Sequence, residues 1–250
     1  MKKWLVILAV LLLGTTNVFS QEQTKTLYDV YLEKGIDAYE NSDYTSAIKW
    51  WKEASKYAKK LGDTEYYSIS LYNIATCYLD LFDYSNALEH YNQIIKIYRD
   101  FGDCNNIFYY NYAICLYYLG HYRDAIKYYR QYLNSVNQAL GRYSNDYATG
   151  LNDLAACYFS IGQYSQSIEL YNEVISIQKT VLGDEHPLLA KSYSNLAHIF
   201  YELKDYYSSI ELNKQALLIC EDDWSEQGRY LIGIAKCYKA IGLCDYGIAV

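Results

Sequence analysis

The chain has 250 residues, of which 52% are apolar, 20% are charged and 33 are tyrosine. This apolar content can form an ordinary hydrophobic core and excludes a disordered chain. The formal net charge is −7 and no run of basic residues occurs. Because phosphate binding depends on clustered Lys and Arg, we expect no nucleic-acid partner. The single proline is typical of long uninterrupted helices.

Residues 1–20 have the pattern of a cleavable secretory signal. Two lysines precede ten apolar residues, and the small residues Val18 and Ser20 stand just ahead of Gln21. The apolar run is too short to span a bilayer. We therefore expect an exported bacterial protein, periplasmic or secreted, with cleavage near Ser20/Gln21 and no membrane span in the mature chain. An uncleaved N-terminal anchor is the alternative.

One pattern occurs six times along the rest of the chain. Its clearest copy is residues 195–210, and the copies begin at positions 33, 73, 111, 153, 195 and 233. Self-similarity at a period of this length indicates a stacked repeat architecture. We expect a short unstructured lead-in at residues 21–27. A single solenoid domain of about six repeats, the last incomplete, is expected to occupy residues 28–250.

Each copy predicts two amphipathic helices. Apolar residues recur at i, i+3, i+4 and i+7, as in Leu71, Ile74, Ala75 and Tyr78, which places them on one helical face. A short turn with Asp or Gly follows, and the second helix ends at a glycine, which accepts the left-handed conformation of a helix terminus. The sequence thus predicts an all-α protein, an α-solenoid of stacked antiparallel helix hairpins.

Seven cysteines occur, and four of them lie two residues after the alanine of a repeat: Cys77, Cys115, Cys157 and Cys237. Equivalent positions of stacked helices lie roughly 8–10 Å apart, beyond the ~7 Å Cα limit of a disulfide. We expect these four to be small apolar residues at tight helix contacts. The remaining three lie near repeat edges, and their redox state stays open: Cys104, Cys220 and Cys244.

No pattern in the chain predicts catalysis. The four histidines are scattered, and none is paired with Ser, Cys or a carboxylate as a nucleophile system requires. Neither a glycine-rich phosphate loop nor a Cys–His cluster with metal-ligand spacing occurs. We expect a protein that is not an enzyme and that has no cofactor and no metal.

The repeat resembles the tetratricopeptide repeat. In the fourth copy, a small residue of the first helix is followed by the aromatic–x–x–small step from Tyr164 to Ser167, with a further aromatic, Tyr171, four residues on. The long loop at residues 181–190 and the segment 194–197 are similar to the kinesin-light-chain type of this repeat. The resemblance implies a right-handed superhelix in which the first helix of each pair lines a concave groove.

On that basis, the residue two before each repeat alanine would lie in the groove. These positions form a ladder of three amides and one carboxylate: Asn73, Asn111, Asp153 and Asn195. An amide both donates and accepts hydrogen bonds and could therefore hold the backbone of an extended peptide. The alternative is that each asparagine bonds to the neighbouring helix. Further expected groove residues are Tyr72, Tyr110, Ile114, Tyr118 and His198.

We therefore expect an exported scaffold that binds an extended peptide or protein segment in its groove. One alternative is the sensor or recruitment half of a longer protein, with a protease-like or signalling domain after Val250. A weaker alternative is a glycan-binding module in which Trp50, Trp51 or Trp224 is a stacking platform. The sequence leaves the partner's identity and the oligomeric state open.

Overall fold

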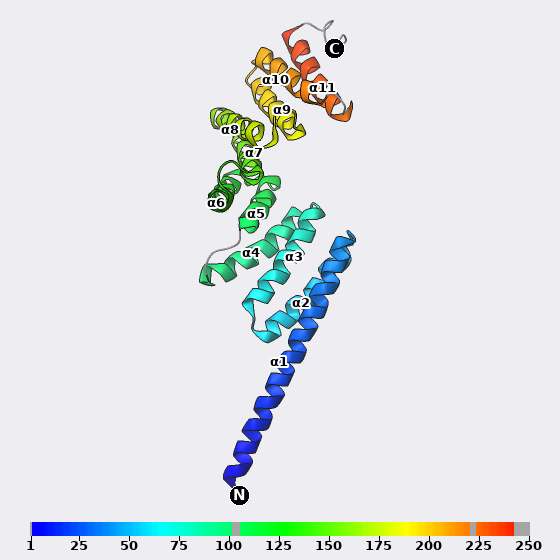
Figure 1. Cartoon of the computed structure of the whole chain (residues 1–250), viewed down its shortest axis with the longest axis vertical. Helices are drawn as coiled ribbons and strands as arrows, with labels where there is room; N and C mark the ends of the chain where they lie inside the picture. Colours follow the sequence, from blue (N-terminus) through cyan, green and yellow to red (C-terminus); the bar gives the residue numbers. More distant parts are fainter. Residues whose placement is uncertain (1, 102–105, 221–223, 243–250) are drawn as a thin grey trace. The chain divides into compact units, whose positions relative to one another are not determined.

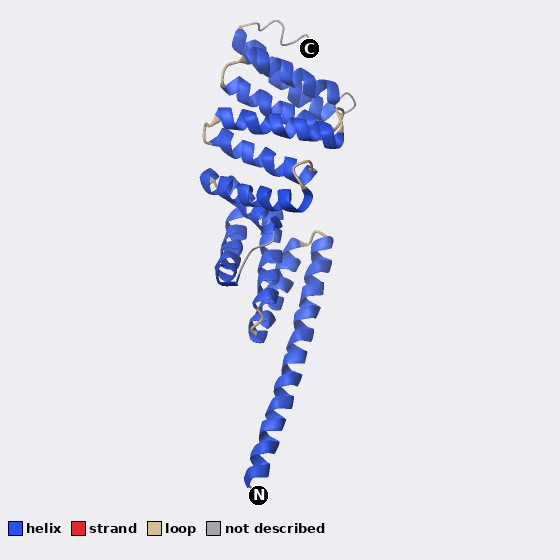
Figure 2. Ribbon diagram, turned by 60° about the vertical axis from the view of Figure 1, so that its left-hand side comes forward, coloured by secondary structure: helices blue, strands red, loops and turns tan. Residues whose placement is uncertain are grey.

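The computed structural model describes residues 2–101, 106–220 and 224–242, and Figures 1 and 2 show only helices and connecting turns in these ranges. Side chains are described for residues 21–97, 108–220 and 226–242. The helices of the described ranges are α1 (Lys2–Glu40), α2 (Tyr44–Leu61), α3 (Thr64–Asp80), α4 (Tyr84–Phe101), α5 (Asn106–Tyr118), α6 (Tyr122–Leu140), α7 (Asn145–Ser160), α8 (Tyr164–Leu182), α9 (Pro187–Glu202), α10 (Tyr206–Ile219) and α11 (Trp224–Ile241). The all-α prediction is confirmed.

The chain divides into two compact units, residues 1–119 with α1 to α5 and residues 120–250 with α6 to α11. Within each unit every helix packs against the next one in the chain, as the helix-hairpin prediction requires. In addition, α3 contacts α5 in the first unit and α9 contacts α11 in the second. These further contacts bring the first helices of successive repeats together.

In the five hairpins from α1 to α10, the turn has a residue of positive φ directly before the second helix's N-cap position. An aspartate caps α2, α4 and α10, whereas His121 and Gln163 at the start of α6 and α8 make no side-chain cap bond. In the second hairpin Phe82 has φ of 59°, and the N–H groups of Phe82 and Asp83 donate to the last carbonyls of α3. The Asp83 carboxylate then accepts the N–H of Asn86 at 3.1 Å and caps α4. The equivalent residues of positive φ in other hairpins are Ser42, Gly120, Gly162 and Lys204.

The predicted role of the repeat cysteines is confirmed. All four thiols are fully buried and form no disulfide, and the repeat alanines Ala75, Ala113 and Ala155 are also fully buried, whereas Ala235 is half-buried. Small side chains at these positions let two helix backbones approach closely. Cys220 is likewise a buried free thiol, whereas Cys104 and Cys244 lie outside the described residues.

A large aromatic residue of the second helix fills the space beneath the first helices. In the first four copies an aromatic residue stands eighteen residues after the start of the copy and is buried: Trp51, Tyr91, Tyr129 and Tyr171. Tyr171 of α8, for example, belongs to one core cluster with Ala155 of α7 and Leu196 of α9. The fifth copy has Asn213 at this position.

The prediction of an unstructured lead-in at residues 21–27 was wrong, because these residues lie within α1. No glycine or proline occurs from residue 15 to residue 34, so nothing in this stretch ends the helix. Tyr28 of α1 packs against α2, where it is buried with Ala54 and Ala58. Among the described helices, none combines the length and the apolarity that crossing a membrane requires.

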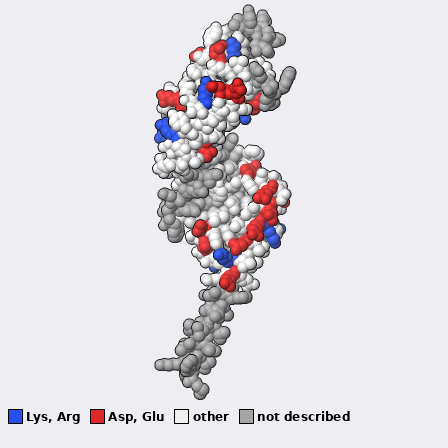
Figure 3. Space-filling model, viewed as in Figure 1, with Lys and Arg blue, Asp and Glu red and all other residues white. Residues whose placement is uncertain are grey.

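The face drawn in Figure 3 carries a band of acidic side chains over the part of the first unit where α1 runs. Four of the exposed acidic residues of α1 recur at helical spacing: Asp29, Glu33, Asp37 and Glu40. Residues three or four apart lie on one side of a helix, so these carboxylates form a stripe in contact with solvent.

Candidate peptide-binding groove

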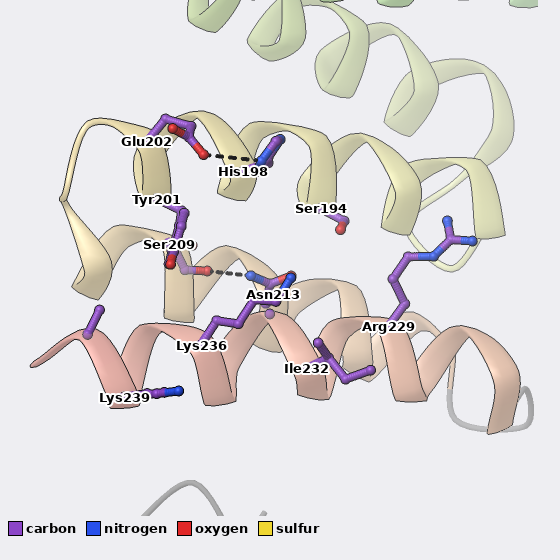
Figure 4. Close-up of a pocket in the computed structure, with 12 residues that line it drawn as sticks. Ser194, His198, Tyr201, Glu202, Ser209, Asn213, Arg229, Ile232, Lys236 and Lys239 are labelled. Carbon is purple, nitrogen blue, oxygen red and sulfur yellow. Dashed lines mark hydrogen bonds and ion pairs between the residues drawn. The ribbon is translucent and has the colours of Figure 1, made fainter. Parts of the chain in front are cut away.

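In the second unit, the first helices of three repeats border two cavities. The larger one has a volume of about 760 Å³ and lies between α9 and α11, with α10 beneath it (Figure 4). The smaller one, of about 230 Å³, is bordered mainly by α7 and α9. Ser194 and Arg229 line both cavities. Side chains of the first helices thus line two concave regions on the surface of this unit.

The structure places two expected groove residues at these cavities. His198 lines the larger cavity and Asn195 the smaller one, and both side chains are exposed. The His198 ring lies against Phe159 of α7, with 5.0 Å between ring centroids. Its Nε2 is 3.5 Å from a carboxylate oxygen of Glu202 one turn later, an ion pair when the imidazole is protonated.

Two of the four ladder residues, Asn111 and Asn195, each donate a hydrogen bond to the neighbouring first helix. Asn111 Nδ2 donates to the hydroxyl of Tyr72 at 3.0 Å, from α5 to α3. In the second unit, Asn195 Nδ2 donates to Asn152 Oδ1 at 3.2 Å, from α9 to α7. Asn152 in turn donates to Asp153 Oδ1 at 3.0 Å.

The acceptors Tyr72 and Asn152 occupy equivalent positions, each one residue before a ladder residue, so the same bond recurs in both units. This arrangement agrees with the alternative that a ladder asparagine bonds to the neighbouring helix. It still leaves each amide with an oxygen that can accept a hydrogen bond from a ligand. The remaining ladder residue, Asn73, is half-buried on α3.

The expected aromatic residues of the first unit differ in exposure. Tyr118 is 60% exposed and stacks face to face on Tyr84 of α4, with 4.4 Å between ring centroids. Tyr110 and Ile114 are half-buried on α5, and so is Tyr72 on α3. Burial raises the pKa of Tyr72, whose ring lies 6.0 Å from that of Tyr91. Tyr118 is therefore the residue of this group that offers the most open ring surface.

Sequence reasoning missed the basic residues of the larger cavity. Arg229, Lys236 and Lys239 of α11 line it, and among the described residues that border it Glu202 is the only acidic one. Lys236 and Lys239 lie 38 residues after His198 and Tyr201, which is the step between the fifth and sixth copies. Their positions in the repeat could therefore have identified them as groove residues.

Neither of the two tryptophans with described side chains, Trp50 and Trp51, presents an open platform for a sugar ring. Trp51 is 3% exposed, and its Nε1 donates to the Leu32 carbonyl at 3.1 Å. Trp50 stacks on Tyr31, and the ammonium groups of Lys34 and Lys49 lie 4.9 and 5.0 Å from its ring centroid. The Trp224 side chain lies outside the described residues. In the described side chains, no group of three His, Cys, Asp or Glu residues is arranged to hold a metal ion.

The fold is similar to that of several solved structures. BtubC (BKLC) from P. vanneervenii has a TM-score of 0.66 and 18% identity, over 82% of this chain and 87% of that one. A tetratricopeptide repeat protein from Parabacteroides merdae has a TM-score of 0.68 and 16% identity, over 90% and 77% of the two chains. A putative kinesin light chain from Podosopora anserina has a TM-score of 0.63 and 18% identity, over 80% and 95%.

No curated protein matches the sequence. A family model described as "Tetratricopeptide repeat" matches residues 26–100, 106–180 and 146–222, which together make up more than half of the chain. These segments coincide with the helix hairpins from α1 to α10. The chain therefore belongs to the tetratricopeptide repeat family.

Proposed function

We propose that this chain is an exported scaffold that binds an extended peptide or protein segment along its first helices. The observation that carries this proposal is the hollow surface of the second unit, where side chains of α7, α9 and α11 border two cavities. Stacked repeats present extended surfaces of this kind to their partners.

The chemistry of these residues supports a peptide ligand. Exposed amides such as Asn195 match the donors and acceptors of a peptide backbone. Tyr201 and Ile232 line the larger cavity and add apolar contact area. One structure with the same fold, YrrB, is described as a tetratricopeptide repeat protein with an unusual peptide-binding site; its TM-score is 0.59 and its identity 12%, over 79% of this chain and 89% of that one.

The groove can be tested with a random peptide library displayed against the full chain. Peptides that bind are measured by fluorescence anisotropy with the wild type and with Asn195→Ala/His198→Ala. Both side chains are exposed, so loss of the Asn195–Asn152 hydrogen bond should lower the free energy of unfolding by no more than about 1 kcal/mol. The double variant should therefore stay folded, which urea unfolding checks, and lose about tenfold in affinity or more. The matched control is Asn172→Ala, an exposed asparagine of the second helix α8. Equal affinity of the double variant and the control would contradict the proposed groove.

Export has its own test. The support for it is the run of two lysines, ten apolar residues and the small residues Val18 and Ser20 at the N-terminus. We expect protein recovered from outside the cytoplasm of a bacterial host to begin near Gln21 by mass spectrometry. Leu8→Arg places a charge in the apolar run and should leave the uncut chain in the cytoplasm. An exported wild-type chain that retains residues 1–20 would indicate the uncleaved anchor instead.

A further inference from the structure

The larger cavity lies where two positions of the repeat both carry a smaller side chain than in the earlier copies. The buried aromatic position of the second helix is Asn213 in α10, in place of the Trp or Tyr of the four earlier copies. The ladder position of the next first helix is Gly233 in α11, in place of Asn or Asp. Both Asn213 and Gly233 line the cavity of about 760 Å³. At the equivalent place one repeat earlier, Tyr171 fills the core between α7 and α9.

The polar floor of this cavity is held in place. Asn213 is 5% exposed, and its Nδ2 donates to the Ser209 carbonyl at 3.0 Å within α10 (Figure 4). A Cβ on Gly233 would lie 3.0 Å from the Asn213 amide, so the glycine lets this amide lie directly against α11. Within the described residues, Asn213 makes no other hydrogen bond, which leaves its Oδ1 and its second N–H for a ligand.

The walls of the cavity carry an excess of positive charge. Arg229, Lys236 and Lys239 come from α11, and Glu202 from α9 is the one carboxylate among the lining residues that the structure describes. Arg229 lies 3.6 Å from Glu226, whereas Lys236 and Lys239 have no ion-pair partner in the described part of the chain. In a protein with a net charge of −7, such an excess favours an anionic ligand group at this place.

We infer that this cavity is a subsite for an acidic side chain, Asp or Glu, of the segment bound in the groove. The inference rests on the proposed function and adds a sequence preference to it. The carboxylate enters between α9 and α11, accepts a hydrogen bond from the Asn213 amide and is balanced by the ammonium groups of Lys236 and Lys239. The missing aromatic ring and the missing Asn or Asp side chain provide the space for it.

The subsite is tested with pairs of peptides selected by the full chain from a random library. Each pair consists of a peptide with Glu or Asp and the same peptide with Gln or Asn. The wild type should bind the acidic member about tenfold more tightly at low salt. Two variants should abolish this preference: Lys236→Gln/Lys239→Gln removes the charges, and Asn213→Tyr restores the aromatic residue and fills the space. The control Lys127→Gln/Lys214→Gln removes two exposed charges from the second helices α6 and α10 and should keep the preference.

The outcomes separate the subsite from the groove. Equal affinities within the pairs for the wild type, or an equal effect of the control, overturn the subsite while peptide binding stands. If no peptide of the library binds the wild type, the proposed function fails and the subsite fails with it. Circular dichroism shows whether Asn213→Tyr folds, and if it does not, the lysine variants alone decide.

Discussion

Gly35 of α1 and Trp51 of α2 form a complementary pair, because a Cβ on Gly35 would overlap the indole ring of Trp51. In the next copy the same two positions are Ala75 and Tyr91, both fully buried. A smaller residue on the first helix thus accompanies a larger aromatic on the second. The two repeats thus fill the same space between their helices with side chains of different size, Gly with Trp in one copy and Ala with Tyr in the next.

This pairing predicts a strong penalty for a single methyl group. Gly35→Ala should lower the free energy of unfolding by about 1–3 kcal/mol, since the added atom cannot be accommodated without displacing Trp51. Gly35→Ala/Trp51→Tyr recreates the Ala75–Tyr91 pair and should recover most of the loss. Urea unfolding of the two single variants and the double variant measures the coupling. Additive effects of the two changes would show that the positions do not share one space.

The turn after α3 offers a stabilising substitution. Phe82 has φ of 59°, a left-handed conformation that is strained for a residue with a side chain, and it is 75% exposed. Phe82→Gly should raise the free energy of unfolding by about 0.5–1 kcal/mol, as Gly120 and Gly162 occupy the same place in other hairpins. Phe82→Ala keeps the strained Cβ and is the control. Thermal unfolding in which alanine stabilises as much as glycine would assign the gain to loss of the exposed ring instead.

Two tyrosines should respond differently to loss of the hydroxyl. The buried Tyr91 hydroxyl has no hydrogen-bond partner within the described residues, whereas the Tyr72 hydroxyl accepts from Asn111 at 3.0 Å. Tyr91→Phe removes an unsatisfied polar group and should leave stability unchanged or raise it by up to about 1 kcal/mol. Tyr72→Phe should lower it by about 0.5–1.5 kcal/mol. Equal losses in urea unfolding would show that Tyr91 has a partner after all.

The buried thiols predict a dependence of stability on alkaline pH. Burial raises the pKa of Cys77, Cys115 and Cys157 to about 12, whereas the pKa of an exposed thiol is about 8.5. The folded chain therefore holds these protons more tightly than the unfolded chain. Their contribution is fully present below about pH 8.5 and is lost progressively as the pH rises towards about 12.

Urea unfolding between pH 7 and 11 checks this expectation. The free energy of unfolding should fall above about pH 8.5, and the fall should be less steep for Cys115→Ala because one linked proton is removed. In the native state at neutral pH, a thiol reagent should modify none of these three buried cysteines. Rapid modification, or a stability that is constant throughout this range, would contradict the assignment of these thiols as protonated core groups.

The sequence by itself determined the helix hairpins, their turns and the role of the repeat cysteines. These features recur at equivalent positions, as with Ala75–Cys77 and Ala113–Cys115, because every repeat buries the same face against its neighbours. The turn at Asp83 can also be predicted from the sequence, because its cap is a hydrogen bond between residues only three positions apart.

Only the tertiary structure decided what the ladder asparagines bond to and where the hollow surface lies. Asn195 and Asn152 are 43 residues apart in sequence, and the hydrogen bond between them depends on how α7 and α9 approach each other. The cavity arises where Asn213 of α10 and Gly233 of α11 lie against each other. Each of these two residues, taken alone in its own copy, gives no sign of a cavity. A contact between side chains of different repeats depends on helix packing, which the period of one repeat does not contain.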